Sequence, residues 1–224
     1  MSSPAPEKIT YTLDVPSHYL HLNAGEGRPL LLFVHGYADS AASFLRRAYP
    51  LGDPSFEVLA PNGPFPLPQR KENEWKEAYG WYFADLSGDK IVIHPNVAAR
   101  AIAGLVEKLG LRDRPKILVG FSQGGYFLPH LARELREVKR FIAIGSGYHP
   151  QFFAEYGLHQ RVHAIHGSED EVIPLAESRA DFERLATGNR GSYRVIPGMP
   201  HKINEHGRAA LRELLLAGPS GLLG

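Results

Sequence analysis

Ser122 lies between two glycines, at a point where the sequence changes from a strand pattern to a helix pattern. The mostly apolar run Lys116–Gly120 precedes it, and an apolar-periodic segment begins at Gln123. A serine in a G-x-S-x-G motif between a strand and a helix is typical of a nucleophile elbow. Glycines relieve crowding in that strained turn, and the Gln123 backbone N–H at the helix start can donate to a developing oxyanion. The motif therefore predicts nucleophilic catalysis by Ser122.

A serine nucleophile also needs a carboxylate, which holds the catalytic base in the right tautomer. When the chain order is serine, acid, histidine, the acid follows a later strand. The run Val162–His166 is predicted to be such a strand, and it leads into Glu169, Asp170 and Glu171. All three acids have a suitable position, so the residue types alone leave the choice open.

The base that accepts the serine proton is predicted to be His201. It follows the predicted strand Tyr193–Pro197 through a short loop and precedes the last apolar-periodic segment. This position completes the chain order of such a site. His206 is the alternative, and it is disfavoured because it falls within the predicted helix.

A second oxyanion donor usually comes from the loop after the first core strand. Here the run Leu30–Val34 leads into His35-Gly36-Tyr37-Ala38-Asp39. We expect the Tyr37 N–H to be this donor, with the Ala38 N–H as the alternative. His35 precedes the serine in the chain, so we expect it to support the loop by hydrogen bonding and not to transfer protons.

These residues meet only if a sheet brings several strand ends together. Short apolar runs alternate with segments of helical period from Leu30 onward, which predicts an α/β fold with a mostly parallel central sheet flanked by helices. The predicted strands are Leu30–Val34, Phe56–Ala60, Lys116–Gly120, Phe141–Gly145, Val162–His166 and Tyr193–Pro197. The predicted helices are Asn96–Leu109, Gln123–Glu137, Pro174–Ala186 and Ile203–Ala217.

Local signals sharpen two of these elements. In the first helix, Asn96 is expected to cap the start and Gly110 to end it in the left-handed conformation. The stretches Lys8–Val15 and His18–Asn23 alternate well enough to predict an N-terminal hairpin within residues 1–29 at the sheet edge. The 224 residues are expected to form one domain, 1–224.

Composition excludes several classes of function. Lys plus Arg (25) and Asp plus Glu (24) leave a net charge of +1, so no nucleic acid partner is expected. The absence of cysteine excludes disulfides, thiolate metal sites and a cysteine nucleophile. The longest apolar run, 29–34, is too short for a membrane span, and no signal sequence opens the chain. We therefore expect a cytoplasmic protein.

Two long connections bear on the substrate. The connection Pro61–Pro95 is rich in proline and aromatic residues, which line a substrate groove or form a local core. Its candidate substrate-binding residues are Phe65, Trp75, Trp81 and Phe83. The connection Ser146–Gln160 stands where a lid is usual, and it is too short and polar to close over a deep lipid pocket. A minimal lid and an open groove predict short- to medium-chain acyl substrates.

Other chemistries find less support. Gly145-Ser146-Gly147 could begin a dinucleotide fingerprint, but its sixth position is Pro150. His159, His163 and His166 suggest a metal site, but His163 and His166 should face opposite sides of a strand. We expect no metal and no cofactor.

Four segments together resemble the carboxylesterase/phospholipase family of α/β-hydrolases, which includes the acyl-protein thioesterases. They occur in the family's order, the resemblance runs from about Leu30 to Leu216, and Ala38 stands where the family usually has glycine. The segments are His35-Gly36, Gly120-Phe121-Ser122-Gln123-Gly124-Gly125, His166-Gly167-Ser168-Glu169-Asp170 with Pro174, and Gly198-Met199-Pro200-His201.

The resemblance implies an α/β-hydrolase fold and selects Asp170 as the acid. The expected function is a serine carboxylesterase that acts on a small-molecule ester through an acyl-enzyme. An acyl-protein thioesterase or a lysophospholipase is the alternative. A second alternative is a non-catalytic ligand-binding protein, because a fold alone does not establish activity. A homodimer is compatible with the sequence.

Overall fold

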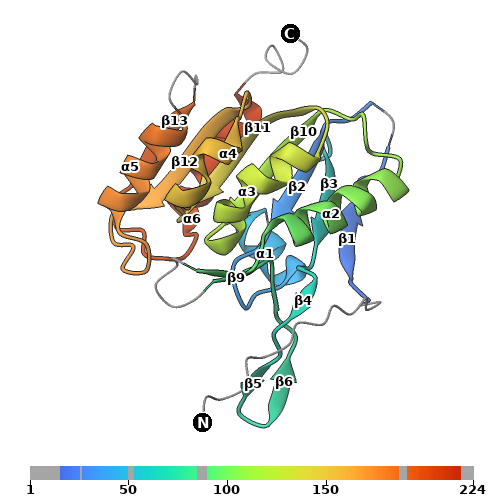
Figure 1. Cartoon of the computed structure of the whole chain (residues 1–224), viewed down its shortest axis with the longest axis horizontal. Coiled ribbons are helices and arrows are strands. Elements are labelled where there is room, and N and C mark those ends of the chain that lie inside the picture. The colour runs from blue at the N-terminus through green and yellow to red at the C-terminus, as the bar shows by residue number, and fades with distance from the viewer. Residues whose placement is uncertain (1–15, 26, 50–52, 85–89, 187–190, 218–224) are drawn as a thin grey trace, which may run out of the picture.

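A seven-stranded sheet forms the centre of the computed structural model, which describes residues 16–25, 27–49, 53–84, 90–186 and 191–217 (Figure 1). The strand β1 is antiparallel to β3, and every other neighbouring pair in this sheet is parallel. In spatial order the strands are β1 (Tyr19–Leu22), β3 (Glu57–Pro61), β2 (Leu30–Val34), β10 (Lys116–Phe121), β11 (Val138–Ile144), β12 (Arg161–Gly167) and β13 (Ser192–Ile196).

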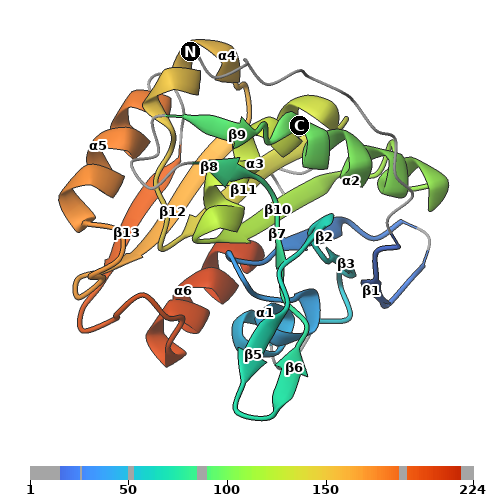
Figure 2. The same ribbon diagram turned by 60° about the horizontal axis from the view of Figure 1, so that its bottom comes forward.

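Helices cover both faces of this sheet (Figures 1 and 2). One face packs against α2, α3, α4 and α5, and the other packs against α1 and α6. The helices are α1 (Ala41–Ala48), α2 (Asn96–Lys108), α3 (Gln123–Glu134), α4 (Phe153–Tyr156), α5 (Leu175–Leu185) and α6 (Glu205–Leu216), and a 3-10 turn, η1 (Pro150–Phe152), precedes α4. No helix among the described residues has both the length and the apolar character that a membrane crossing needs.

The strand β2 shows why its sequence is a continuous apolar run. Leu30, Leu32 and Val34 pack in the core on the side of α2 and α3, whereas Leu31 and Phe33 pack on the side of α1 and α6. Successive side chains of a strand point to opposite faces, so a strand covered on both sides needs apolar residues at every position. The predicted fold class is confirmed.

All six predicted core strands and all four predicted helices are present; β2 has the predicted bounds, and the other elements have shifted ends. The strand β11 begins at Val138, three residues before the predicted Phe141. The helix α3 correspondingly ends at Glu134 and not at Glu137. The reason lies in the backbone, because Leu135 is extended and Glu137 has a φ of 56°, which turns the chain directly into β11.

The two predicted ends of α2 have different outcomes. The Asn96 cap was wrong, since Pro95 occupies the capping position and the Asn96 carboxamide oxygen lies 3.0 Å from His130 Nδ1. Gly110 does end the helix, with a φ of 71°. Its N–H donates to Glu107 O, and the next N–H, of Leu111, donates to Val106 O, which is a Schellman motif.

The predicted N-terminal hairpin is described only in part. Its first arm, Lys8–Val15, lies outside the described residues. The second arm, predicted as His18–Asn23, contains β1, which pairs antiparallel with β3 at the edge of the sheet. The expected extension of the sheet edge is therefore present at β1.

The connection between β3 and α2, for which no strand was predicted, contains short paired strands. These are β4 (Phe65–Pro66), β5 (Gln69–Lys71), β6 (Glu74–Lys76), β7 (Tyr79–Gly80), β8 (Phe83–Ala84) and β9 (Ile91–Ile93). They pair as β4–β7, β5–β6 and β8–β9, and the β5–β6 hairpin projects away from the sheet (Figure 1). Strands of two or three residues carry too little alternation to be recognised in a sequence.

Candidate active site

Ser122 occupies a strained turn between β10 and α3, as the motif predicted. Its φ is 51° and its ψ is −121°, a conformation that costs a non-glycine residue about 1–3 kcal/mol. Both flanking glycines are required by close backbone contacts. A Cβ on Gly120 would lie 2.5 Å from Gly124 O, and a Cβ on Gly124 would lie 2.3 Å from Val34 O in β2. Gly120 therefore relieves the turn itself, whereas Gly124 allows α3 to approach the neighbouring strand.

Ser122, His201 and Asp170 form one hydrogen-bonded chain. The distance from Ser122 Oγ to His201 Nε2 is 2.9 Å, and His201 Nδ1 lies 2.8 Å and 3.0 Å from the two carboxylate oxygens of Asp170. A carboxylate only accepts, so Nδ1 carries a proton and Nε2 is left to accept from the serine hydroxyl. This is the tautomer that a general base beside a serine nucleophile requires.

Burial distinguishes Asp170 from the two neighbouring acids that the residue types had left open. The Asp170 side chain is fully buried, whereas Glu169 and Glu171 are exposed. Besides His201, the Asp170 carboxylate accepts from the N–H groups of Val172 and Ile173 at 3.0 Å and 2.9 Å. Of the three acids, Asp170 alone is bonded to His201. The alternative base, His206, is exposed in α6.

The loop after β2 lies directly against the elbow. A Cβ on Gly36 would be 3.5 Å from the Ser122 Cβ and 3.2 Å from the Phe121 ring. His35 is completely buried and supports this loop, since its Nε2 accepts from the Gly63 N–H at 3.0 Å and its Nδ1 lies 2.7 Å from Gly36 O. Burial lowers the pKa of His35 to about 4, which keeps the ring neutral in this role. The expected structural function of His35 is confirmed.

Ala38 adopts the conformation for which the family's glycine is suited. Its φ is 52°, in the left-handed region that costs an alanine roughly 1–2 kcal/mol. The neighbouring residue compensates, because Asp39 forms a bridge with Tyr79, whose N–H donates to Asp39 O at 2.8 Å. Arg47 in α1 also donates to the Asp39 carboxylate at 2.5 Å. These contacts fix the turn in spite of the alanine.

Gln123 contributes more than its backbone. Its side-chain Oε1 accepts from the Trp81 N–H and its Nε2 donates to Tyr82 O, both at 3.0 Å. Its backbone N–H belongs to the first turn of α3, where N–H groups have no acceptor within the helix. A Cβ on Gly80 would lie 3.6 Å from Gln123 Oε1 and 3.7 Å from the Tyr37 ring. The side chains of the two residues whose N–H groups are the candidate oxyanion donors therefore border the same glycine.

Two of the four predicted substrate-binding residues form an aromatic wall with Tyr37. The Phe83 ring lies 5.6 Å from the ring of Phe65 and 6.4 Å from that of Tyr37, measured between centroids. Phe65 and Phe83 are partly exposed, and Tyr37 is 55% exposed. This aromatic wall (Tyr37, Phe65 and Phe83) carries apolar surface beside the loop that follows β2.

The other two residues are placed differently. The prediction that Trp81 lines the groove was wrong, because its side chain is completely buried. Its indole stacks on Phe127 and donates to His35 O at 2.8 Å, so it belongs to the core. Trp75 is 70% exposed in the projecting β5–β6 hairpin, opposite Arg70, and the ring contacts of the aromatic wall do not include it.

The connection Ser146–Gln160 is folded onto the protein surface. It contains η1 and α4, and the side chains of Tyr148, Phe152 and Tyr156 are buried in the core beside α3. From the sequence, this segment was judged by its polar residues, and the packing of these three aromatic residues was not predicted. The segment is therefore part of the packed body.

Gly145, at the end of β11, is a site residue that the sequence analysis missed. Its φ is 52°, and a Cβ there would lie 3.2 Å from Asp170 Oδ2 and 3.5 Å from His201 Nδ1. Any side chain would press on the bond between these two residues. Gly145-Ser146-Gly147 had been considered only as a nucleotide motif, and the signal for its true position was that it follows a strand adjacent to the Ser122 strand.

Two of the three histidines that suggested a metal site contact other groups. His163 Nδ1 lies 2.9 Å from Ser192 Oγ, and His166 Nε2 lies 2.9 Å from Ile173 O. Within the described ranges, no group of three or more histidine, aspartate or glutamate side chains is arranged to hold a metal ion.

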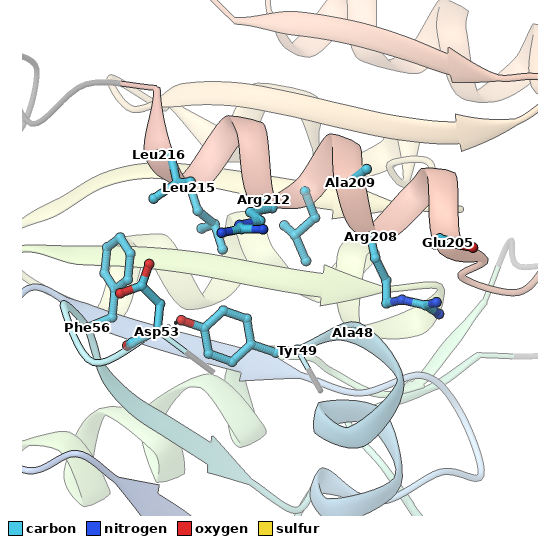
Figure 3. A pocket seen from close by; sticks show the side chains of 11 residues that line it. Ala48, Tyr49, Asp53, Phe56, Glu205, Arg208, Ala209, Arg212, Leu215 and Leu216 are labelled. Carbon is cyan, nitrogen blue, oxygen red and sulfur yellow. Dashed lines mark hydrogen bonds between the residues drawn. The ribbon is translucent and has the colours of Figure 1, made fainter. Parts of the chain in front are cut away.

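A cavity of about 450 Å3 lies outside this site, between α6 and the segment around the end of α1 (Figure 3). Tyr49, Phe56 and Leu215 line it, with Arg208 and Arg212 on the same helix face. None of Ser122, Asp170 and His201 borders it. The cavity is therefore separate from the hydrogen-bonded chain at the strand ends.

The fold and the serine elbow together define an α/β-hydrolase. The sequence model of the Phospholipase/Carboxylesterase family matches residues 21–216, so the chain belongs to this family. No curated protein matches the chain.

Solved structures show the same fold. Esterase PE8 has a TM-score of 0.66 and 24% identity, over 92% of this chain and 99% of that protein. Acyl-protein thioesterase 2 of Zea mays has a TM-score of 0.66 and 15% identity, with the same coverage of 92% and 99%. A carboxylesterase from Mesorhizobium loti has a TM-score of 0.67 and 20% identity, over 93% of this chain and 98% of that protein.

Proposed function

We propose that this protein is a serine carboxylesterase that hydrolyses short- to medium-chain carboxylic esters through an acyl-enzyme. The observation that carries the proposal is the hydrogen-bonded chain Ser122–His201–Asp170. Membership of the Phospholipase/Carboxylesterase family supports the same chemistry. We also propose that residues 1–224 form a single domain, which is supported by the family match over residues 21–216.

In the proposed reaction, Ser122 Oγ attacks the ester carbonyl while His201 Nε2 takes its proton. The negative charge that develops on the carbonyl oxygen is stabilised by the backbone N–H groups of Tyr37 and Gln123. His201 then protonates the departing alcohol, which leaves Ser122 acylated. A water molecule, deprotonated by His201, attacks the acyl-enzyme and releases the acid, and Asp170 stabilises the imidazolium in both steps.

The surroundings of Ser122 support the proposed substrate class. The aromatic wall offers apolar contact for an acyl or alcohol group. The segment Ser146–Gln160 is packed onto α3 through its aromatic residues, so it offers no cover for a long chain. A short to medium acyl group can bury most of its surface against such a wall, whereas the far end of a long chain would stay in water.

The proposal is tested with p-nitrophenyl esters from acetate to palmitate. We expect kcat/KM to be highest for a short or medium chain, with no increase above the micelle concentration. Ser122→Ala should reduce turnover to background and abolish covalent labelling by a fluorophosphonate. Ser55→Ala, on an exposed turn before β3, is the matched control and should retain both activities.

The remaining outcomes separate the alternatives. A maximum at palmitate would favour a long-chain thioesterase or lysophospholipase, which the similarity in fold to an acyl-protein thioesterase makes the main competitor. A folded protein that turns over no ester and resists the fluorophosphonate would favour a non-catalytic ligand-binding protein.

A further inference from the structure

A second histidine, His166, lies behind the proposed catalytic acid. It is near the end of β12, is only 1% exposed, and has no part in the proposed reaction. Its Nε2 lies 3.7 Å from Asp170 Oδ2, the oxygen that accepts from His201 Nδ1. Asp170 thus has one imidazole at hydrogen-bond distance and a buried one just beyond it.

His166 holds the turn that carries Asp170. Its Nε2 donates to Ile173 O at 2.9 Å, because a carbonyl can only accept. The Ile173 N–H donates in turn to Asp170 Oδ1 at 2.9 Å. Both backbone polar groups of Ile173 are therefore used, one by Asp170 and the other by His166. The Asp170 carboxylate is oriented by a turn that His166 anchors to β12.

The other side of the His166 ring is tied to three further elements. Its Nδ1 lies 3.0 Å from Ser178 Oγ in α5. Ser178 Oγ also lies 2.5 Å from Ser146 O, just after β11, and accepts from the Tyr193 hydroxyl of β13 at 2.9 Å, so its single proton is shared between two acceptors, Ser146 O and Nδ1 of the neutral His166. Since β13 leads directly to His201, this network joins the segments that carry the acid and the base.

A neutral ring suits this position. Burial lowers the pKa of His166, with the Ile173 carbonyl and Asp170 acting in the opposite direction and His201 adding to the lowering. A cation at His166 would compete with protonated His201 for the Asp170 carboxylate. A neutral N–H donor fixes the turn without that competition.

We propose that His166 is a positioning residue that orients Asp170 toward His201 through the carbonyl of Ile173. This inference rests on the proposed function. A misplaced Asp170 would stabilise the His201 imidazolium less, both in the transition state and in the resting enzyme. The expected signature is a lower kcat together with an acid limb of the pH profile that moves to lower pH.

Two variants isolate the contact. The amide of His166→Gln can reach the position of Nε2 and keep the donor to Ile173, whereas the shorter amide of His166→Asn replaces Nδ1 and loses that donor. We expect His166→Asn to lower kcat by about tenfold to a hundredfold, with KM little changed and the acid limb moved down by roughly half a pH unit. His166→Gln should keep most of the wild-type kcat and leave the acid limb near its wild-type pH.

His163→Asn is the matched control, because His163 is a buried histidine of the same strand that bonds Ser192 instead. It should leave kcat and the acid limb unchanged. The inference is overturned if His166→Asn keeps the wild-type kcat, if both His166 variants lose activity equally with no movement of the limb, or if His163→Asn moves it as much. If His166→Asn does not fold, the test rests on His166→Gln and Ser178→Ala. The inference is then overturned if both variants have a reduced kcat but the acid limb of the wild type. Failure of the proposed function looks different, since Ser122→Ala would then match the wild type.

Discussion

Two neighbouring regions of the molecule are stabilised by different forces. The first is formed by the strand ends that carry Ser122, Asp170 and His201, and the second is the connection between β3 and α2. The first region continues from a sheet that is buried on both faces, so the strand that precedes each side chain fixes its position. The second contains two- and three-residue strands, and side-chain contacts such as the bond from Trp81 to His35 and its stack on Phe127 join it to the core. Sequence motifs located the first region well, and composition located the second poorly.

An aromatic residue on a long connection is therefore not by itself a sign of a binding site. Trp81 and Trp75 are six residues apart in the chain, yet one is completely buried and the other is 70% exposed.

The largest effect is expected at Asp170. Asp170→Asn should lower kcat by about 10³–10⁴, because an amide can hold His201 in the wrong tautomer and stabilises the imidazolium less. Glu169→Gln and Glu171→Gln are the controls. Both acids are exposed, and their variants should stay within about tenfold of the wild type in a p-nitrophenyl butyrate assay. A crippled Glu169→Gln beside an active Asp170→Asn would contradict the assignment of the acid.

The two tryptophans should differ in stability. Trp81→Ala is expected to lower the free energy of unfolding by about 3–5 kcal/mol, because it removes a fully buried indole that stacks on Phe127. Trp75→Ala, in the exposed hairpin, should change it by less than about 0.5 kcal/mol. Urea unfolding followed by circular dichroism measures both. A marginal effect of Trp81→Ala would show that the connection contributes little to the core.

A smaller, pH-dependent effect is expected from His35, which joins the two regions through Gly63 and Trp81. Its pKa is about 4 in the folded protein and 6.5 in the reference state, so between these values the unfolded chain binds the proton that the folded protein excludes. Its contribution to stability is therefore complete above pH 6.5 and is lost as the pH falls toward 4, at up to about 1.4 kcal/mol per pH unit.

The measurement is the free energy of unfolding between pH 7 and pH 4. His35→Gln, which can still accept from Gly63 but does not titrate in this range, should show a shallower slope than the wild type. His206→Gln, in an exposed position of α6, serves as the control and should keep the wild-type slope. Equal slopes in all three proteins would contradict the buried neutral state of His35.

The sequence alone determined the sheet and the chain order of the proposed catalytic residues. Continuous apolar runs mark strands covered on both faces, and G-x-S-x-G between a strand and a helix marks the elbow, because both patterns express local constraints on neighbouring residues. The positions of Ser122 and His201, and the three acids from which Asp170 was taken, could be read in this way. The family resemblance was needed to choose Asp170.

Only the tertiary structure decided which residues touch. The burial of Trp81, the position of Gly145 against Asp170 and His201, and the contact of His166 with the Asp170 turn all depend on segments far apart in the chain. The helix cap predicted at Asn96 is absent for the same reason, because the Asn96 side chain bonds to His130 in the neighbouring helix. Local patterns report the preferences of one segment, whereas burial and hydrogen-bond partners are set by whichever other segments pack against it.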